Sequence, residues 1–166
     1  MFLATTPPPP MPATITVTVT KVYDGDTFNG VTPGNPQEIK IRVACVDAPE
    51  LNQPGGKPSR ISLLESLPLG TVVEIRPVAP NDRYNRTPAI IIKEGENINL
   101  KQVLGGHAWF YPEYSRTCSE YVPALKAAEY EARFNRLGVW GQLDPCRPAD
   151  WRSGKCVDQL PDCKPI

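Results

Sequence analysis

The most informative stretch of the sequence is residues 41–50, which read IRVACVDAPE. Period-2 alternation places Cys45 on the apolar face of a predicted strand and Arg42 on the opposite face. The proline before Glu50 has no N–H to donate, so the strand must end in a corner that carries Asp47 and Glu50. An arginine beside two carboxylates can hold a phosphate diester and a hard cation together. The same ten residues could equally form an ordinary surface ion pair on a turn.

The composition is that of one globular domain, with 166 residues, 40% hydrophobic residues and 22% charged residues. No apolar run approaches the length of a membrane span, so we expect no membrane-spanning segment. The 18 basic and 18 acidic side chains leave no net charge, so no global field would attract a polyanion. Any nucleic-acid binding must therefore come from a local cluster of arginines.

Proline is unusually frequent, with 20 copies, and it is densest in residues 7–12 and again after Leu143. Such segments favour extended, polyproline-type conformations rather than a packed core. We therefore predict a proline-rich N-terminal tail at residues 1–13, one domain at 14–143, and a C-terminal tail containing cysteine and proline at 144–166.

Five cysteines occur without a C-x-x-C pair, so a zinc site is not expected: Cys45, Cys118, Cys146, Cys156 and Cys163. Cys45 is interpreted as a small buried hydrophobic residue of its strand. The other four would be paired in an oxidising compartment, with three possible connectivities, of which we favour Cys118–Cys146 and Cys156–Cys163. This pattern predicts secretion or a periplasmic location, although the first residues lack the basic and apolar regions of a signal peptide.

The hydrophobic periodicity predicts an α+β fold. Strand patterning covers residues 14–23, 37–46, 71–78 and 89–93, and turns at 24–26 and 31–36 indicate an antiparallel meander. Helical spacing is found in residues 57–67 (with Ile61, Leu64 and Leu67 in register), 98–104 and 120–137 (with Leu125, Ala128 and Ala132 in register). About five short strands with late helices fit a five-stranded barrel of the OB type, a fold that often binds nucleic acids.

Two further stretches carry chemistry compatible with the 41–50 corner. One is DGDT at residues 24–27, and the other is DRYNR at residues 82–86. Each has an ordinary explanation on its own, since Asp-Gly-Asp is usually a turn and a loop arginine is usually a solvated cation. Their occurrence together, in one small domain, is much more specific.

Taken together, these motifs resemble those of the thermonuclease, or staphylococcal nuclease-like, family. The resemblance rests on V-x-D-G-D-T, R-x-x-x-x-D-x-P-E, D-x-Y-x-R, Gly-His-Ala-Trp and a late Arg-Leu-Gly-Val-Trp, found at residues 22–27, 42–50, 82–86 (as D-R-Y-x-R), 106–109 and 136–140. Their order and approximate separations also match, so the similarity covers roughly residues 16–141.

This resemblance implies an OB-type β-barrel with three helices and a calcium-dependent endonuclease site. Such enzymes generally cut both DNA and RNA and leave products ending in a 3′-phosphate. By motif position, Asp26 and Asp47 would give carboxylate oxygens to Ca²⁺, and Ala48 would give its backbone carbonyl. Water and a substrate phosphate would complete the shell of roughly six to eight oxygens. Glu50 would orient or deprotonate the attacking water.

The remaining assignments concern the substrate. Arg42 and Arg86 would bind the scissile phosphate and stabilise the charge of its transition state. Arg83, Tyr84 and Tyr111 are expected to contact the nucleotide around that phosphate.

Several residues near these motifs call for a structural interpretation or depart from the family pattern. His107 is the only histidine, and because the family does not use this position we expect it to be structural. Trp109 and Phe110 suit core packing at least as well as nucleotide binding. Ala48 replaces a threonine, which is harmless if only its carbonyl binds the ion. Asn85 stands where glycine is common in the family, and this difference could change the direction in which the Arg86 side chain points.

The leading hypothesis is therefore a secreted, monomeric, calcium-dependent nuclease that does not discriminate between sugars. The main alternative is a catalytically silent OB-fold module that binds nucleic acid or a protein. A third possibility, a calcium-stabilised structural domain, would not need arginines beside the ion. A silent relative should have lost part of the site, whereas this sequence retains every member: Asp26, Arg42, Asp47, Glu50 and Arg86.

Overall fold

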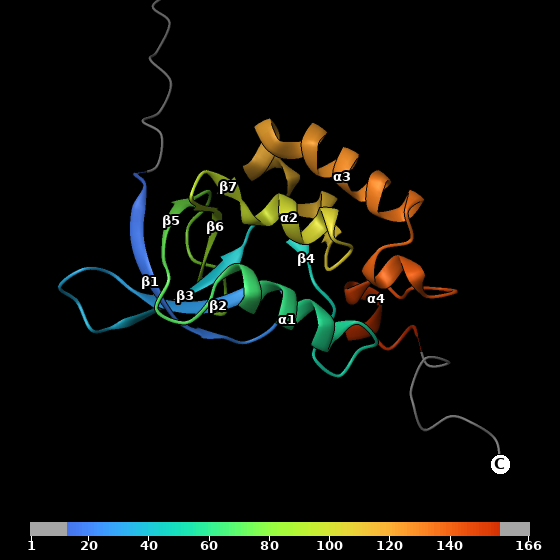
Figure 1. Ribbon diagram of the computed structural model, residues 1–166, viewed down its shortest axis with the longest axis horizontal. Helices are drawn as coiled ribbons and strands as arrows, with labels where there is room; N and C mark the ends of the chain where they lie inside the picture. Colours follow the sequence, from blue (N-terminus) through green and yellow to red (C-terminus); the bar gives the residue numbers. More distant parts are fainter. Residues whose placement is uncertain (1–12, 157–166) are drawn as a thin grey trace, which may run out of the picture.

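The structure, a computed structural model, describes residues 13–156. Its strands close into a barrel (Figure 1) made of β1 (Ile15–Val22), β2 (Thr27–Val31), β3 (Glu38–Val43), β5 (Val72–Pro77) and β6 (Arg86–Lys93). Antiparallel pairing joins β1 to β2, β2 to β3, β1 to β5 and β5 to β6. The parallel pairing of β3 with β6 closes the ring, which confirms the predicted α+β fold with an OB-type barrel.

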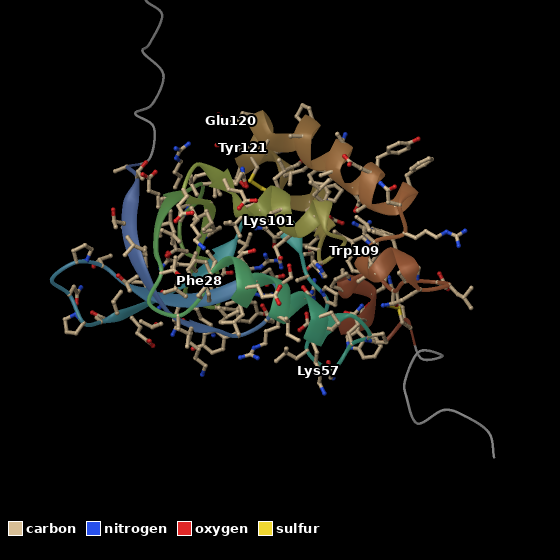
Figure 2. All side chains as sticks on the ribbon, in the orientation of Figure 1. Phe28, Lys57, Lys101, Trp109, Glu120 and Tyr121 are labelled. Atoms are coloured by element: carbon tan, nitrogen blue, oxygen red, sulfur yellow. A yellow bond between two sulfur atoms is a disulfide. The ribbon has the colours of Figure 1, made fainter. Side chains whose placement is uncertain are left out.

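The alternation in β1 explains how the barrel is filled. Val17, Val19 and Val22 are buried, whereas the threonines between them lie closer to solvent. Phe28, labelled on the barrel in Figure 2, and Ile41 from the two following strands are completely buried in the same core. The antiparallel meander predicted from the sequence is confirmed.

Short strands and helices cover the barrel on one side, opposite the loop between β2 and β3 (Figure 1). The remaining elements are β4 (Val46–Asp47), α1 (Gly56–Ser66), β7 (Glu96–Asn97), α2 (Ile98–Leu104), β8 (Trp109–Phe110), the 3-10 helix η1 (Pro112–Tyr121), α3 (Val122–Phe134), the 3-10 helix η2 (Gly138–Gly141) and α4 (Pro148–Arg152). The three predicted helices correspond to α1, α2 and α3. The short helix α4 lies in the segment that was expected to be extended.

Two helical details differ from the prediction. In α1, Ile61 points outward with 52% of its surface exposed, whereas Leu63 is completely buried and small residues such as Ser59 make the rest of the contact. The long helix begins later than expected, at Val122, because η1 takes up the preceding residues. Its predicted apolar stripe is confirmed by the burial of Leu125, Ala128 and Ala132.

The predicted disulfide pairing is wrong, and Cys45, although buried as expected, is not an unpaired cysteine. Cys45 is bonded to Cys118, with 6.4 Å between their Cα atoms, and Cys146 is bonded to Cys156, with 6.3 Å. The reason is local: β3 ends at residue 43, and Cys45 follows in a left-handed conformation (φ 63°) instead of continuing the strand. Cys163, like residues 1–12, lies outside the described residues.

Within residues 13–156, no helix is both long and apolar enough to cross a bilayer.

Candidate active site

One cleft gathers almost all the residues that the sequence motifs identified. Its lining includes Asp26, Arg42, Asp47, Glu50, Arg83, Tyr84, Arg86 and Tyr111. Ala48 is the exception, because it lies behind the surface of the cleft with 3% of its area exposed. Segments far apart in the chain therefore converge on one surface, as the motifs predicted.

Asp26 is held in a fixed orientation by its neighbours. Its Oδ1 accepts a hydrogen bond from the Thr27 hydroxyl at 3.0 Å, and its Oδ2 accepts one from the Ala48 N–H at 2.7 Å. Gly25 makes this close approach possible, because a Cβ at that position would lie only 2.9 Å from the Cβ of Ala48. The turn between β1 and β2 is thus packed directly against the corner after β4.

Arg42 reaches the cleft from strand β3 of the barrel, and Asp47 reaches it from β4, outside the barrel. The pairing of β4 with β8 places Asp47 opposite Trp109 and leaves it 4% exposed. The Arg42 guanidinium, from β3, lies 3.3 Å from Asp26 and 3.5 Å from Asp47. Burial raises the pKa of Asp47, an effect only partly opposed by the hydrogen bond from Arg152.

Negative charge is crowded at this point. Burial, followed by repulsion from the Asp26 carboxylate, raises the pKa of Asp24 to about 7. Such crowding favours the binding of a hard cation by the oxygens of Asp26 and Asp47. No group of three or more histidine, cysteine, aspartate or glutamate side chains in residues 13–156 forms a metal site by itself. The side chains would therefore provide only part of a coordination shell.

The loop before β6 presents Arg86 through a network centred on Asp82. One carboxylate oxygen of Asp82 accepts hydrogen bonds from the backbone N–H groups of Tyr84 and Arg86. The other oxygen accepts one from the side-chain Nε–H of Arg86, at 2.8 Å. Asn85 adopts a left-handed conformation (φ 57°), which asparagine tolerates better than most residues, so the missing glycine does not disturb the loop. Nη1 of Arg86 lies 3.5 Å from the Thr27 hydroxyl that also binds Asp26.

The Tyr84 ring is close to the guanidinium groups of both arginines of this loop. The guanidinium carbon of Arg83 is 4.9 Å from the ring centroid, and that of Arg86 is 5.2 Å from it. Tyr84 is 61% exposed, so its ring remains available to a ligand. Tyr111 contacts Tyr114 edge to face across another part of the lining, with 5.0 Å between ring centroids.

Glu50 is the most accessible carboxylate of the predicted set, with 36% of its side chain exposed. Its backbone N–H donates to the side-chain Oε1 of the buried Gln53 at 3.1 Å. In return, the backbone N–H of Gln53 donates to the Glu50 carbonyl. This reciprocal pair fixes the backbone at the corner. The side chain remains at the cleft surface, where water can reach it.

Arg152, which lines the cleft and contacts two of its carboxylates, was not among the predicted site residues. This arginine comes from α4 and binds both Asp47 and Glu50. No motif marks it, and it lies beyond the similarity recognised in residues 16–141. The only available signal was its position between Cys146 and Cys156, which becomes informative once those two cysteines are known to be bonded.

The structural interpretations of the aromatic run and the histidine agree with the structure. Trp109 is 2% exposed and packs edge to face against Trp140, with 5.1 Å between ring centroids. Phe110 is also buried. His107 is absent from the cleft lining and lies in the α1–α2 region, where its carbonyl accepts the Ser59 hydroxyl at 2.6 Å.

Comparison with known proteins gives consistent results. A profile of the staphylococcal nuclease homologue family matches residues 40–142, which is more than half of the chain. An uncharacterized endonuclease of Haemophilus influenzae is 36% identical over 86% of this chain and 75% of its own length. A micrococcal nuclease of Shigella flexneri is 32% identical over 80% of this chain and 77% of its own length. The staphylococcal-like nuclease CAN1 of Arabidopsis thaliana is 30% identical over 72% of this chain and 35% of its own length.

The barrel topology, the converging motifs and these relatives all lead to one assignment. The chain belongs to the staphylococcal nuclease family and is a nuclease, that is, a phosphodiesterase.

Proposed function

We propose that the protein is a calcium-dependent endonuclease that hydrolyses DNA and RNA and leaves products ending in a 3′-phosphate. The observation that carries this proposal is the presence of two arginines and three carboxylates in one cleft: Arg42, Arg86, Asp26, Asp47 and Glu50. Arginine forks suit phosphate oxygens, and carboxylates suit a hard cation, so the cleft has groups for both partners.

The donor set fits calcium. Asp26 and Asp47 are buried carboxylates that share the guanidinium of Arg42, and their oxygens are the type of ligand that calcium prefers. Asp26 and Asp47 would hold the ion together with the carbonyl of Ala48, and water and a substrate phosphate would complete the shell. A bound calcium ion would supply positive charge that neutralises the phosphate during attack.

Glu50 is proposed as the general base. Its partly exposed carboxylate would accept a proton from a water molecule. The oxygen of that water would form a bond to phosphorus, and the bond between phosphorus and the 5′-oxygen would break, with the 5′-oxygen taking up a proton from solvent water to become a 5′-hydroxyl. The phosphate would then remain on the 3′ side, which accounts for the proposed product.

Arg42 and Arg86 are proposed to bind the scissile phosphate and to stabilise its additional negative charge in the transition state. The hydrogen bonds of Asp82 keep Arg86 oriented toward the cleft. Arg83, Tyr84 and Tyr111 would contact the nucleotide, and the exposed Tyr84 ring can stack on a base of any identity. This mode of binding is consistent with a nuclease that accepts both DNA and RNA.

The two disulfides are typical of an oxidising environment, which supports the proposal of a secreted or periplasmic enzyme. We further propose that the enzyme is active as a monomer, because the cleft is built from residues of a single chain.

A catalytically silent binding module is the less favoured alternative. Such a module would need the arginines to hold a nucleic acid, but it would not need Glu50 beside a buried carboxylate pair. The presence of Glu50 in the same cleft as Asp26 and Asp47 therefore favours hydrolysis over binding alone.

The test is cleavage of plasmid DNA and of a folded RNA by the parent protein and by two matched variants. Glu50→Gln removes the proposed base, whereas Glu94→Gln makes the same chemical change in the exposed turn before β7. We expect the parent and Glu94→Gln to cut both substrates and Glu50→Gln to be severely impaired. Normal cleavage by Glu50→Gln would contradict the assignment of the base.

A further inference from the structure

The guanidinium of Arg152 occupies two of the carboxylates on which the proposed function depends. Nη1 donates to Asp47 Oδ1 at 3.1 Å and to Glu50 Oε1 at 2.9 Å, and Nη2 donates to Asp47 Oδ2 at 3.0 Å. Both oxygens of Asp47 are therefore engaged by one planar fork, the most specific arrangement between an arginine and a carboxylate. Arg152 thus binds the groups assigned to the metal and to the base at the same time.

This arginine is delivered by a segment that is anchored at both ends. The disulfide between Cys146 and Cys156 closes a short loop, with a sequence separation of 10, and α4 lies within that loop. Nε2 of the buried Gln53 donates to the Cys146 carbonyl at 2.7 Å, while Oε1 of the same side chain accepts the Glu50 N–H. The anchored loop and the catalytic corner are therefore joined through one side chain.

Arg42 and Arg152 both contact Asp47, but they differ in their freedom to move. The Arg42 side chain is 13% exposed and also binds the Val43 carbonyl and Asp26, so it is fixed within the barrel wall. The Arg152 side chain is 41% exposed, and each of its contacts with the cleft goes to Asp47 or Glu50 among the described residues. Of the two cations, Arg152 is the one that can leave without opening the barrel.

We propose that Arg152 is a positioning residue that holds Asp47 and Glu50 and competes with the divalent ion for Asp47. The inference rests on the proposed function, in which Asp47 is a ligand. An ion that takes an oxygen of Asp47 must displace the fork from it. Only molecules in which Arg152 has left Asp47 can bind the ion. The apparent association constant is therefore the intrinsic constant multiplied by the fraction of such molecules.

The experiment is calorimetric titration of calcium into the full chain without nucleic acid, which does not depend on turnover. Arg152→Gln removes both the charge and the fork, whereas Arg152→Lys keeps the charge but cannot engage both oxygens of Asp47 together with Glu50. Lys155→Gln is the matched control, because it removes one positive charge from the same loop at an exposed side chain that contacts only Asp150 among the described residues. Thermal unfolding of each variant verifies that the fold is retained.

The proposal predicts that Arg152→Gln binds calcium about three- to tenfold more tightly than the parent, and that Arg152→Lys lies between the two. The control Lys155→Gln should bind like the parent. Unchanged or weaker binding by folded Arg152→Gln and Arg152→Lys would overturn the proposal, since a purely structural arginine would weaken binding when removed. Equal tightening by Lys155→Gln would also overturn it, because general charge would then be the cause.

The same titration separates this inference from the proposed function. If the parent binds calcium and Arg152→Gln binds it no more tightly, the proposed competition is wrong but the calcium site remains supported. If neither the parent nor Arg152→Gln binds calcium, the calcium dependence in the proposed function is wrong, and the proposed competition is wrong as well. Binding by Arg152→Gln alone supports the competition in its strongest form.

Discussion

Asp26 and Glu50 are both carboxylates of the cleft, but their surroundings suit different tasks. Asp26 is 5% exposed and both of its oxygens accept hydrogen bonds from neighbouring residues, so its position is fixed before any ligand arrives. Glu50 has a side chain that is 36% exposed and contacts Arg152 through Oε1. A fixed, buried carboxylate suits a metal ligand, whereas an accessible one suits exchange of protons with water.

The first prediction separates these two tasks. Asp26→Asn removes a charge from the proposed coordination shell, so calcium should bind about tenfold more weakly or worse, and some activity should return at high calcium. Glu50→Gln should leave calcium affinity nearly intact and lower kcat by something on the order of 10²–10⁴-fold. Calorimetry and steady-state cleavage measure both effects. Rescue of Glu50→Gln by added calcium would mean that Glu50 is a ligand instead.

The second prediction concerns the shape of the cation at Arg42. Arg42→Lys retains the charge but loses the fork that can grip two phosphate oxygens, so turnover should fall on the order of 10²-fold. Lys40→Ala is the comparison, since Lys40 lines the same cleft and contacts the Tyr23 ring, and we expect it to have a much smaller effect. Equal kcat values for the two variants would remove Arg42 from the reaction.

At the scale of elements, the two disulfides tie different parts of the chain together. Cys45–Cys118 links the corner after β3 to η1 across a sequence separation of 73, whereas Cys146–Cys156 closes a separation of only 10 around α4. In the chain-entropy description, the longer loop restricts the unfolded chain more strongly. The first bridge should therefore contribute mainly to global stability and the second to local placement of Arg152.

The third prediction follows from this difference. Replacing Cys45 and Cys118 together by alanine should lower the free energy of unfolding by about 4 kcal/mol, and replacing Cys146 and Cys156 by about 3 kcal/mol. Both Cys45 and Cys118 are buried, whereas only Cys146 of the second pair is, so removal of the sulfur atoms should leave more unfilled space in the first variant. Denaturant unfolding of the two double variants gives the comparison. A larger loss from the Cys146 and Cys156 pair would contradict this account.

The elements that the sequence predicted well are those with strong local patterns. The alternation in β1 and the spacing of Leu125, Ala128 and Ala132 in α3 come from burial of one face, and both are found in the structure. In α1 the same reasoning placed Ile61 inward, and it failed because the buried face includes small polar residues such as Ser59. Periodicity detects large apolar side chains, and it overlooks a helix that packs closely through serines and glycine.

At the scale of the whole molecule, the contacts that sequence patterns missed are those between distant segments. The partners of Cys45 and Cys146 depend on how β3 ends and where the C-terminal segment folds back, and neither is encoded in local spacing. Arg152 reaches Asp47 across a sequence separation of 105 for the same reason. The motif residues of the cleft were predictable because their order and spacing resemble a known family, whereas Arg152 lies outside that pattern.

The fourth prediction concerns stability against acid. Burial lowers the pKa of His107, opposed in part by the charge of Glu65, so the folded state favours the neutral imidazole. The stability contributed by this preference is complete above the unfolded value of about 6.5 and is lost as the pH falls from there through the lower folded value. His107→Gln should therefore lose less stability than the parent between neutral pH and pH 5. Denaturant unfolding at both pH values measures this, and equal losses would exclude His107 as the cause.

The central claim is that one cleft of this chain forms a calcium-dependent phosphodiesterase site. The most direct test is cleavage of a 5′-labelled DNA oligonucleotide by the parent protein, first with a calcium chelator and then with calcium in excess, with analysis of the new ends. The account predicts no cleavage in chelator, cleavage on addition of calcium, and fragments that end in a 3′-phosphate. Cleavage that persists in chelator, or fragments that end in a 3′-hydroxyl, would contradict it.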